Sequence, residues 1–156
     1  MAAGQPRRAS CGWSPAELAC AVDDDGRMDD SARCPCLSGE TWGACCGPLH
    51  AHVVPGPTAE RLMRSRYSAF AVGDVSWLLE TWHPSTRPDE LELDPTARWF
   101  RLDVLRTERG GPLDDQGVVE FAAHRRVDGD AEVQREVSRF VRDRSRRWLY
   151  VDGVPG

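Results

Sequence analysis

Four cysteines within one short stretch carry the clearest chemistry in this chain: Cys34, Cys36, Cys45 and Cys46. They form two tight pairs, C-x-C and C-C, separated by eight residues. A structural zinc ion prefers four thiolates in a tetrahedral shell, and a loop that folds back on itself can bring two such pairs around one ion. The spacing predicts one structural Zn²⁺, and a shell of four protein ligands leaves no open position for zinc catalysis.

Disulfides and free thiols are the alternatives to a metal site. A disulfide within either pair would be strained, but a bond across the pairs, such as Cys34 to Cys45, can form in an oxidising compartment. The first residues contain no apolar run of the kind that a secretory signal needs. We therefore expect a cytoplasmic protein, in which clustered cysteines bind metal more often than they form disulfides.

The cysteine stretch resembles the SEC-C motif, a zinc knuckle known from the carboxyl end of the translocation ATPase SecA. Further blocks extend the resemblance to the YchJ family of bacterial proteins. These blocks are CCGPLH at 45–50, LMRSRYSAF at 62–70, TWHPSTR at 81–87, VEF at 119–121, EVSRF at 136–140 and WLYVDG at 148–153. Leu37 and Glu40 depart from the motif, because a Gly and a Lys are usual there. The resemblance implies a zinc ion and a nuclear-transport-factor-2-like (NTF2-like) middle domain, and it implies no particular reaction.

The pattern of the chain divides it into three parts. Residues 1–30 show no sustained periodicity and are expected to be a disordered extension, of which the first 27 residues add nothing to the fold. Residues 31–52 form the cysteine knuckle, and residues 58–153 form an α+β domain, which we call the cone domain. The knuckle is too short for a core of its own, so we expect a separable unit that depends on its metal.

Two helices followed by an antiparallel meander are expected in the cone domain, with the sheet curved over the helices. Thr58 can cap a helix that ends near Val72, and Asp74 can cap a second helix that ends near His83. Alternating apolar residues predict strands at 99–106, 117–127, 131–143 and 147–151, with a tight turn at Asp128-Gly129.

A pocket between the sheet and the helices is the expected place for a ligand. Its candidate residues are Tyr67, Trp82, His83, Glu120, Glu136 and Ser138. Burial would raise the pKa of either glutamate, as a general acid or base requires, but pairing with arginines such as Arg101 or Arg139 is the favoured interpretation. His83 is expected to satisfy carbonyl groups at the end of its helix, and no residue is assigned a catalytic role.

The remaining histidines are expected to be exposed. His50 and His52 fall in a linker, where four cysteines already fill the metal shell, and His124 is expected on the solvent side of its strand.

Composition restricts the partners of the chain. The 156 residues carry a formal charge of −5, which disfavours indiscriminate binding to nucleic acid. Local basic patches remain conceivable around Arg61, Arg64 and Arg66 and along residues 142–147. No apolar run reaches the length of a membrane span.

Two classes of function fit these features. The favoured one is a non-enzymatic adaptor that docks a protein partner through the knuckle. The alternative is a small acid–base enzyme or a small-molecule-binding protein that uses the pocket of the cone domain, with zinc serving only the fold. The sequence predicts neither the identity of a partner nor the oligomeric state.

Overall fold

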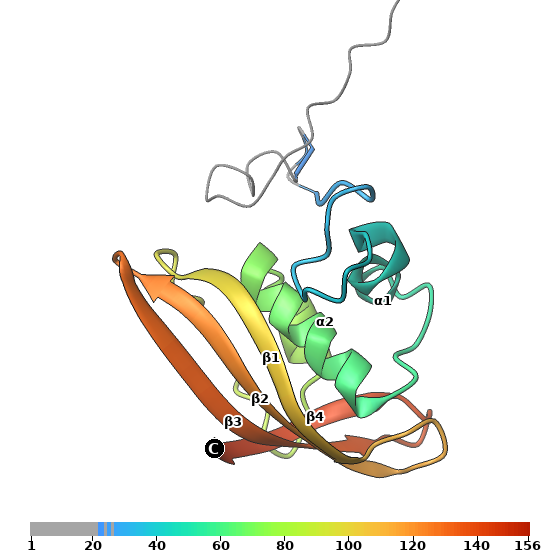
Figure 1. Ribbon diagram of the computed structural model, residues 1–156. Helices are drawn as coiled ribbons and strands as arrows, with labels where there is room; N and C mark the ends of the chain where they lie inside the picture. Colours follow the sequence, from blue (N-terminus) through green and yellow to red (C-terminus); the bar gives the residue numbers. More distant parts are fainter. Residues whose placement is uncertain (1–21, 24, 26) are drawn as a thin grey trace, which may run out of the picture.

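The computed structural model describes residues 22, 23, 25 and 27–156, so most of the expected disordered extension lies outside the described residues (Figure 1). A short 3-10 helix, η1, precedes three α-helices and four β-strands. Their bounds are η1 Trp42–Ala44, α1 Cys46–His50, α2 Ala59–Val72, α3 Val75–Glu80, β1 Arg98–Arg109, β2 Gln116–Val127, β3 Asp130–Arg142 and β4 Trp148–Pro155. The expected α+β class is confirmed.

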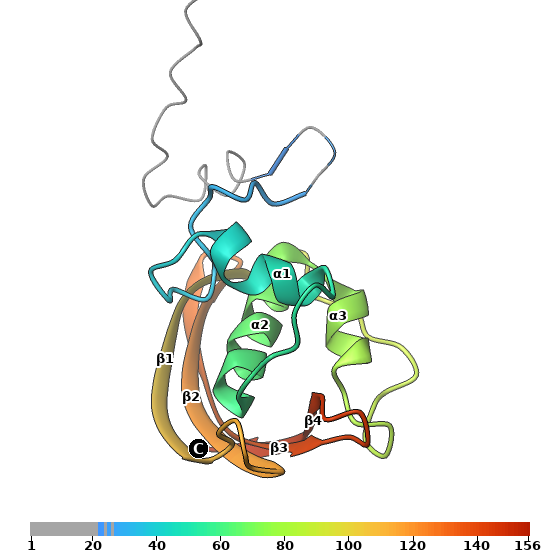
Figure 2. The ribbon, with the colours of Figure 1, turned by 90° about the vertical axis from the view of Figure 1, so that its right-hand side faces the viewer.

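The strands form one antiparallel sheet in the order β1-β2-β3-β4. Asp128 (φ 50°) and Gly129 (φ 91°) both have left-handed backbones in the β2–β3 turn, as a tight primed hairpin turn requires. Register shifts interrupt the pairing of β1 with β2 at two places and that of β3 with β4 at one, and such irregularities bend a sheet. The sheet consequently curls around α2, with α3 beside the opening of the curl (Figures 1 and 2).

Local sequence explains the helix ends. The Thr58 side chain accepts a hydrogen bond from Arg61 N, and the Asp74 side chain accepts one from Trp77 N. Gly73, at φ 78°, ends α2 in the left-handed conformation.

Helix α3 stops at Glu80, earlier than the expected His83, because the chain there pairs with β4. Tyr150 N donates to Thr81 O at 2.8 Å, and His83 N donates to Tyr150 O at 2.7 Å. The prediction that His83 caps its own helix is therefore wrong: its backbone belongs to a bridge to the sheet.

One continuous core joins the knuckle to the cone domain. The four cysteines, Trp42 and Leu49 belong to the same buried cluster as side chains of α2, α3 and the sheet. Helix α2 lies between the cysteine knuckle and the sheet (Figure 2), and it contacts both, through Ser68 on Cys46 and Tyr67 on Trp99. The two parts are thus packed together, although the sequence suggests a separable knuckle.

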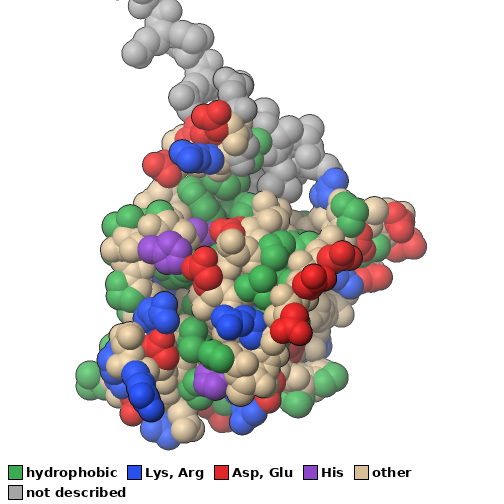
Figure 3. All heavy atoms as spheres, turned by 180° about the vertical axis from the view of Figure 1, so that it is seen from behind, with side chains coloured by type: hydrophobic (Ala, Val, Ile, Leu, Met, Phe, Trp, Pro, Cys, Tyr) green, Lys and Arg blue, Asp and Glu red, His purple; other side chains and the backbone are tan. Residues whose placement is uncertain are grey.

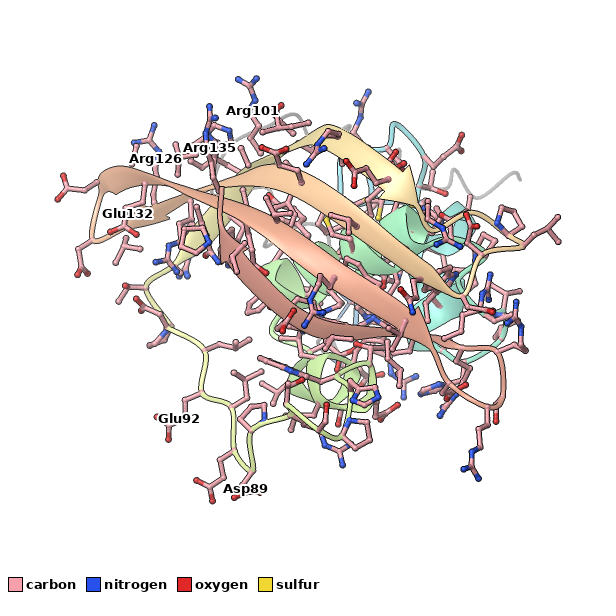
Figure 4. All side chains as sticks on the ribbon, turned by 90° about the horizontal axis from the view of Figure 1, so that it is seen from below. Asp89, Glu92, Arg101, Arg126, Glu132 and Arg135 are labelled. Atoms are coloured by element: carbon pink, nitrogen blue, oxygen red, sulfur yellow. The ribbon has the colours of Figure 1, made fainter. Side chains whose placement is uncertain are left out.

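The outer face of the sheet is covered by charged side chains. Arg101, Arg126 and Arg135 project from one side of the sheet, near the β2–β3 turn, whereas Asp89 and Glu92 project from the segment that precedes β1 (Figure 4). Acidic and basic side chains also break up the hydrophobic ones on the face shown in Figure 3. Among the described residues, no helix is long and apolar enough to cross a membrane.

Candidate metal centre and adjoining cavity

The sulfur atoms of the four cysteines come together at one point of the fold. All four lie within 4.8 Å of one another, and all four residues are buried. The separation is 3.5 Å between the sulfurs of Cys36 and Cys45, and 3.9 Å between those of Cys45 and Cys46. A tetrahedral Zn²⁺ site with Zn–S bonds of about 2.3 Å has sulfur–sulfur edges of about 3.8 Å. The donor set therefore fits a metal ion of this kind.

Side chains from the knuckle and from α2 donate hydrogen bonds to this sulfur cluster. Ser68 Oγ donates to Cys46 Sγ at 3.3 Å, and Ser38 Oγ lies 3.1 Å from Cys45 Sγ. Arg61 reaches Cys45 with both terminal nitrogens, one at 3.1 Å from its sulfur and one at 3.2 Å from its carbonyl oxygen. Donors of this kind stabilise thiolates and hold them in place around a metal.

Crowding separates the pKa values of three of the thiols, those of Cys34, Cys36 and Cys46. Hydrogen bonds from the thiols of Cys34 and Cys46 lower the pKa of Cys36, whereas the hydrogen bond to Cys36 raises the pKa of Cys34 to about 12. The pKa of Cys46 is raised by its bonds to the same two cysteines and by burial. A divalent cation binds the thiolate form and so supplies the positive charge that lets neighbouring thiols ionise together.

His50 is buried beside this cluster, which corrects the expectation of an exposed linker histidine. Its side chain is only 7% exposed, and it lies between the rings of Trp42 and Trp77, at 4.9 and 5.0 Å. Its Nδ1 lies 3.0 Å from Asp74 Oδ2, and its Nε2 lies 2.8 Å from Ser65 O. His50 therefore joins α1 to both α2 and α3.

His52 and His124 also bear on the sequence-based expectations. His52 has a side chain that is 62% exposed, as expected, and forms an ion pair with Glu80. His124 lies on the outer face of the sheet, where Nε2 contacts Asp103 Oδ2 at 2.9 Å.

A cavity of about 190 Å³ opens between α2 and the concave face of the sheet. Aromatic rings supply much of its wall. The lining residues are Met63, Arg66, Tyr67, Phe70, Trp82, Trp99, Phe121, Ala123, Gln134, Glu136, Ser138, Phe140 and Tyr150. The structure thus brings together Tyr67, Trp82, Glu136 and Ser138 from the six pocket candidates.

Arg66 forms the positively charged part of the cavity wall. The residue is 6% exposed, and its Nη1 donates to Leu78 O and to Thr81 Oγ1, both at 2.7 Å. Its guanidinium carbon lies 5.1 Å from the ring centre of Trp82 and 4.5 Å from that of Tyr150. Burial lowers the pKa of Arg66 to about 10, so the group is still a cation at neutral pH.

Glu136 forms the negatively charged part of the wall. Its Oε1 accepts hydrogen bonds from Ser138 Oγ at 2.7 Å and from the Tyr150 hydroxyl at 2.9 Å, and its Oε2 accepts one from Gln134 at 3.3 Å. Burial and then the charge of Glu136 raise the pKa of Tyr150, which stays a neutral donor. The favoured pairing of Glu136 with an arginine is wrong, because its partners are neutral donors.

Two of the pocket candidates lie elsewhere. Glu120 points away from the cavity, and its Oε2 lies 3.3 Å from Arg106 Nε. Glu120 therefore pairs with an arginine, as expected, but its partner is neither Arg101 nor Arg139. Side chains alternate along β2, and Phe121 takes the inward position. The ring of His83 contacts Ser85 Oγ at 2.6 Å and does not line the cavity.

The polar lining residues that were not among the candidates from the sequence are Arg66, Gln134 and Tyr150. Gln134 could have been found, since it lies two and four positions before Glu136 and Ser138 and so shares their face of β3. Arg66 carried no comparable signal, because an arginine on a helix is usually exposed.

Most of the arginines of the two expected basic patches contact other described residues of the protein and so do not form a free basic surface. Arg61 and Arg64 bind the knuckle, the latter through Cys36 O at 3.1 Å, and Arg66 is buried. Arg142 donates to carbonyl groups such as Asp114 O, and Arg147 pairs with Asp143.

Comparison with known proteins agrees with this architecture. Residues 58–153 match the family described as "YchJ, middle NTF2-like domain", and residues 31–48 match the SEC-C motif. A UPF0225 protein of Chromobacterium violaceum is 52% identical over 127 residues, covering 79% of this chain and 93% of that protein. A UPF0225 protein of Corynebacterium efficiens is 50% identical over 122 residues, covering 78% and 92%.

Two solved structures have the same arrangement. One is the solution structure of a SEC-C motif containing protein from Rhodopseudomonas palustris, whose sequence is 35% identical to this chain. The two structures superpose with a TM-score of 0.69 over 79% of this chain and 98% of the Rhodopseudomonas palustris chain. A crystal structure from Psychrobacter arcticus, at 24% identity and a TM-score of 0.65, shares the fold. The chain belongs to the YchJ (UPF0225) family, with a SEC-C motif followed by an NTF2-like domain.

Proposed function

We propose that this protein binds a small molecule in the cavity of the cone domain, and that one structural Zn²⁺ on Cys34, Cys36, Cys45 and Cys46 fixes the helices that line it. The cavity carries this proposal. It is concave, mostly apolar and provided with a few polar groups, which are the usual properties of a ligand site. Reduced thiols in the cytoplasm would keep the metal site intact.

Binding is favoured over acid–base catalysis by the groups in the wall. No histidine lines the cavity, and its one carboxylate, that of Glu136, accepts three hydrogen bonds from protein groups. Those bonds hold the carboxylate in place and occupy its oxygens, so it is not free to contact a substrate as a general base must.

Docking through the knuckle, the favoured expectation from the sequence, has less support. All four cysteines face the interior of the protein, and Arg61 and Ser68 occupy the space beside them. A docking surface would use the polar loop at residues 38–41 or the linker after α1, where Val53 and Val54 are 74% and 44% exposed. The role as a protein adaptor therefore stays a prediction.

The proposal can be tested with an isotope-labelled zinc-bound protein and a panel of single-ring aromatic fragments. We expect saturable NMR shifts that map to the cavity. Ala123 is buried in the wall, so Ala123→Leu should fill the space and abolish these shifts, whereas Ala131→Leu on the exposed start of β3 should not. The proposal is wrong if no fragment binds saturably, or if binding survives Ala123→Leu in a protein that is still folded.

A further inference from the structure

Three donor atoms of this cavity have no acceptor among the described residues, two of them in Arg66 and one in Trp82. Among the described residues, Arg66 uses only Nη1 in hydrogen bonds, so its Nε and Nη2 have no protein acceptor. The indole nitrogen of Trp82 is buried and also has no partner. The Trp82 nitrogen is a buried donor without an acceptor, which is costly, so a ligand that supplies acceptors gains affinity here.

The carboxylate of the cavity, by contrast, already accepts hydrogen bonds from protein groups. Ser138, Tyr150 and Gln134 donate to the two oxygens of Glu136. A ligand that offers only donors would have to displace one of these three groups. Complementarity therefore favours a ligand with acceptors at the Arg66 end.

Charge leads to the same conclusion. Arg66 forms no ion pair at salt-bridge distance with any carboxylate of the described residues. Its positive charge rests against two aromatic rings, one carbonyl and one hydroxyl, and the charge of Glu136 acts on it only at longer range. A guanidinium group has a planar set of donors that matches a carboxylate, and a desolvated site strengthens that attraction.

The other part of the wall determines the body of the ligand. Phe70, Trp99 and Phe121 line the cavity beside α2, and the Tyr67 and Phe70 rings pack on Trp99 at 5.8 and 5.7 Å. A cavity of about 150 Å³ is large enough for benzene, so the space here holds one ring with a short substituent.

We propose that the ligand is a small aromatic carboxylate, with its anionic group on Arg66 and its ring against Phe70, Trp99 and Phe121. This inference rests on the proposed binding function and adds the chemical class of the ligand.

Three probes with the same ring but different charge test whether the cavity prefers an anion, separately from whether it binds an aromatic ring at all. They are phenylacetate, phenylacetamide and 2-phenylethylamine, which are an anion, a neutral isostere and a cation at pH 7. We expect phenylacetate to bind at least tenfold more tightly than either of the others, or about 1.4 kcal/mol. It should also shift the indole N–H resonance of Trp82, which calorimetry alone would not reveal.

Glu136→Gln is the informative variant, because it removes the negative charge of the cavity and keeps an oxygen that accepts from Ser138 and Tyr150. It should tighten phenylacetate binding several-fold and leave phenylacetamide unchanged. Glu120→Gln, on the outer face of the sheet, is the matched control and should change neither. Arg66→Lys keeps the charge and loses the planar donors, so it should weaken phenylacetate binding.

The outcomes distinguish the two proposals. Equal or tighter binding of the amide or the amine, or weaker phenylacetate binding in Glu136→Gln, overturns the carboxylate assignment and leaves the binding function standing. Failure of all three probes to bind, at concentrations up to millimolar, overturns the carboxylate assignment; the fragment panel then decides the binding function separately.

Discussion

The hydroxyl group of Ser68, in the middle of α2, donates a hydrogen bond to the sulfur of Cys46 at 3.3 Å. The same oxygen lies 3.7 Å from the sulfur of Cys34, and the serine is completely buried. Helix α2 also lines the cavity through Met63, Arg66 and Tyr67. The cysteine cluster and the cavity therefore share one helix, and a change at either should affect the other.

Metal removal should destabilise the whole chain. We expect one zinc per chain in metal analysis, and a chelator or Cys36→Ser should lower the midpoint of a single thermal transition. The loss of a few kcal/mol of binding energy lowers the midpoint by about 10 °C in a domain of this size. Circular dichroism measures this transition.

Two separate transitions, of which only the smaller responds to zinc, would contradict this prediction. The knuckle would then be the separable unit that its short length suggests. Glu40→Gln, in the exposed part of the motif, serves as a control and should change neither zinc content nor midpoint.

Arg61 should contribute directly to zinc affinity. Its guanidinium group donates to both the sulfur and the carbonyl oxygen of Cys45, and partners of this kind commonly contribute 10–100-fold to metal affinity. Arg61→Met should weaken zinc binding by about that factor, as measured by competition with a chelator.

Arg64→Met is the matched control for that substitution. Arg64 lies on the same helix and donates to the carbonyl oxygen of Cys36, not to a sulfur. An equal loss of affinity in both variants would mean that the arginines act by holding the backbone of the knuckle.

His50 should contribute to stability, because both ring nitrogens contact buried or half-buried oxygens. His50→Gln cannot keep both contacts and the stacking on Trp77, so we expect a loss of about 1–3 kcal/mol in urea unfolding. His52→Gln changes an exposed contact with Glu80 and an edge-on contact with the Trp77 ring, and should cost less than about 0.5 kcal/mol. Similar costs for the two variants would contradict the role assigned to His50.

Much of the fold could be predicted from local signals. Thr58, Asp74 and Gly73 mark helix ends through their own chemistry, and the Asp128-Gly129 turn fixes the register of the longest hairpin. Strand bounds were less certain, since β4 extends to Pro155 while its expected end was at residue 151.

The environment of each candidate residue was harder to predict. Glu120 and Glu136 are alike in sequence, but Glu136 faces the cavity and Glu120 faces outward, because the register of β2 on β3 fixes their sides. Val133 is 54% exposed on the outer face, while the inner face of β3 carries Glu136 and Ser138. Hydrophobic pattern alone would choose the opposite face as buried.

The environment of His50, in the knuckle, could not be predicted from the sequence either. Its place between Trp42 and Trp77 depends on contacts between residues distant in sequence, which a linker pattern does not reveal.

Gly153 should matter because Glu136 lies over it. A Cβ atom at this position would be 2.0 Å from Glu136 Oε1, so Gly153→Ala must displace the carboxylate from Ser138 and Tyr150. The lost hydrogen bonds should cost about 1–2 kcal/mol in urea unfolding. Gly156→Ala, whose Cβ would have no neighbour within 3.5 Å, is the control.

A double-mutant cycle tests whether Gly153 acts through Glu136. If it does, Gly153→Ala should cost little more in a protein that already carries Glu136→Ala. Additive costs would show that the glycine serves the strand backbone and not the carboxylate.

The boundary of the folded unit should lie at Met28. Among the described residues before it, hydrogen bonds are made only with one another and with Met28, as in Asp23 N to Arg27 O at 2.7 Å. Met28 itself packs on the core, and Asp30 O accepts a hydrogen bond from Gly43 N at 3.0 Å. Most of the segment in question lies outside the described residues, so its contribution is a prediction.

Deleting residues 1–27 should leave the thermal midpoint unchanged within error, because the described residues of this stretch make no hydrogen bond beyond Met28. Deleting residues 1–30 should lower the stability by about 1–3 kcal/mol, since it exposes apolar surface under Met28 and leaves Gly43 N without its acceptor. Both deletions should be compared with the full chain at equal zinc content, because the second one ends close to Cys34. A lower midpoint for the shorter deletion would show that residues before Met28 stabilise the knuckle.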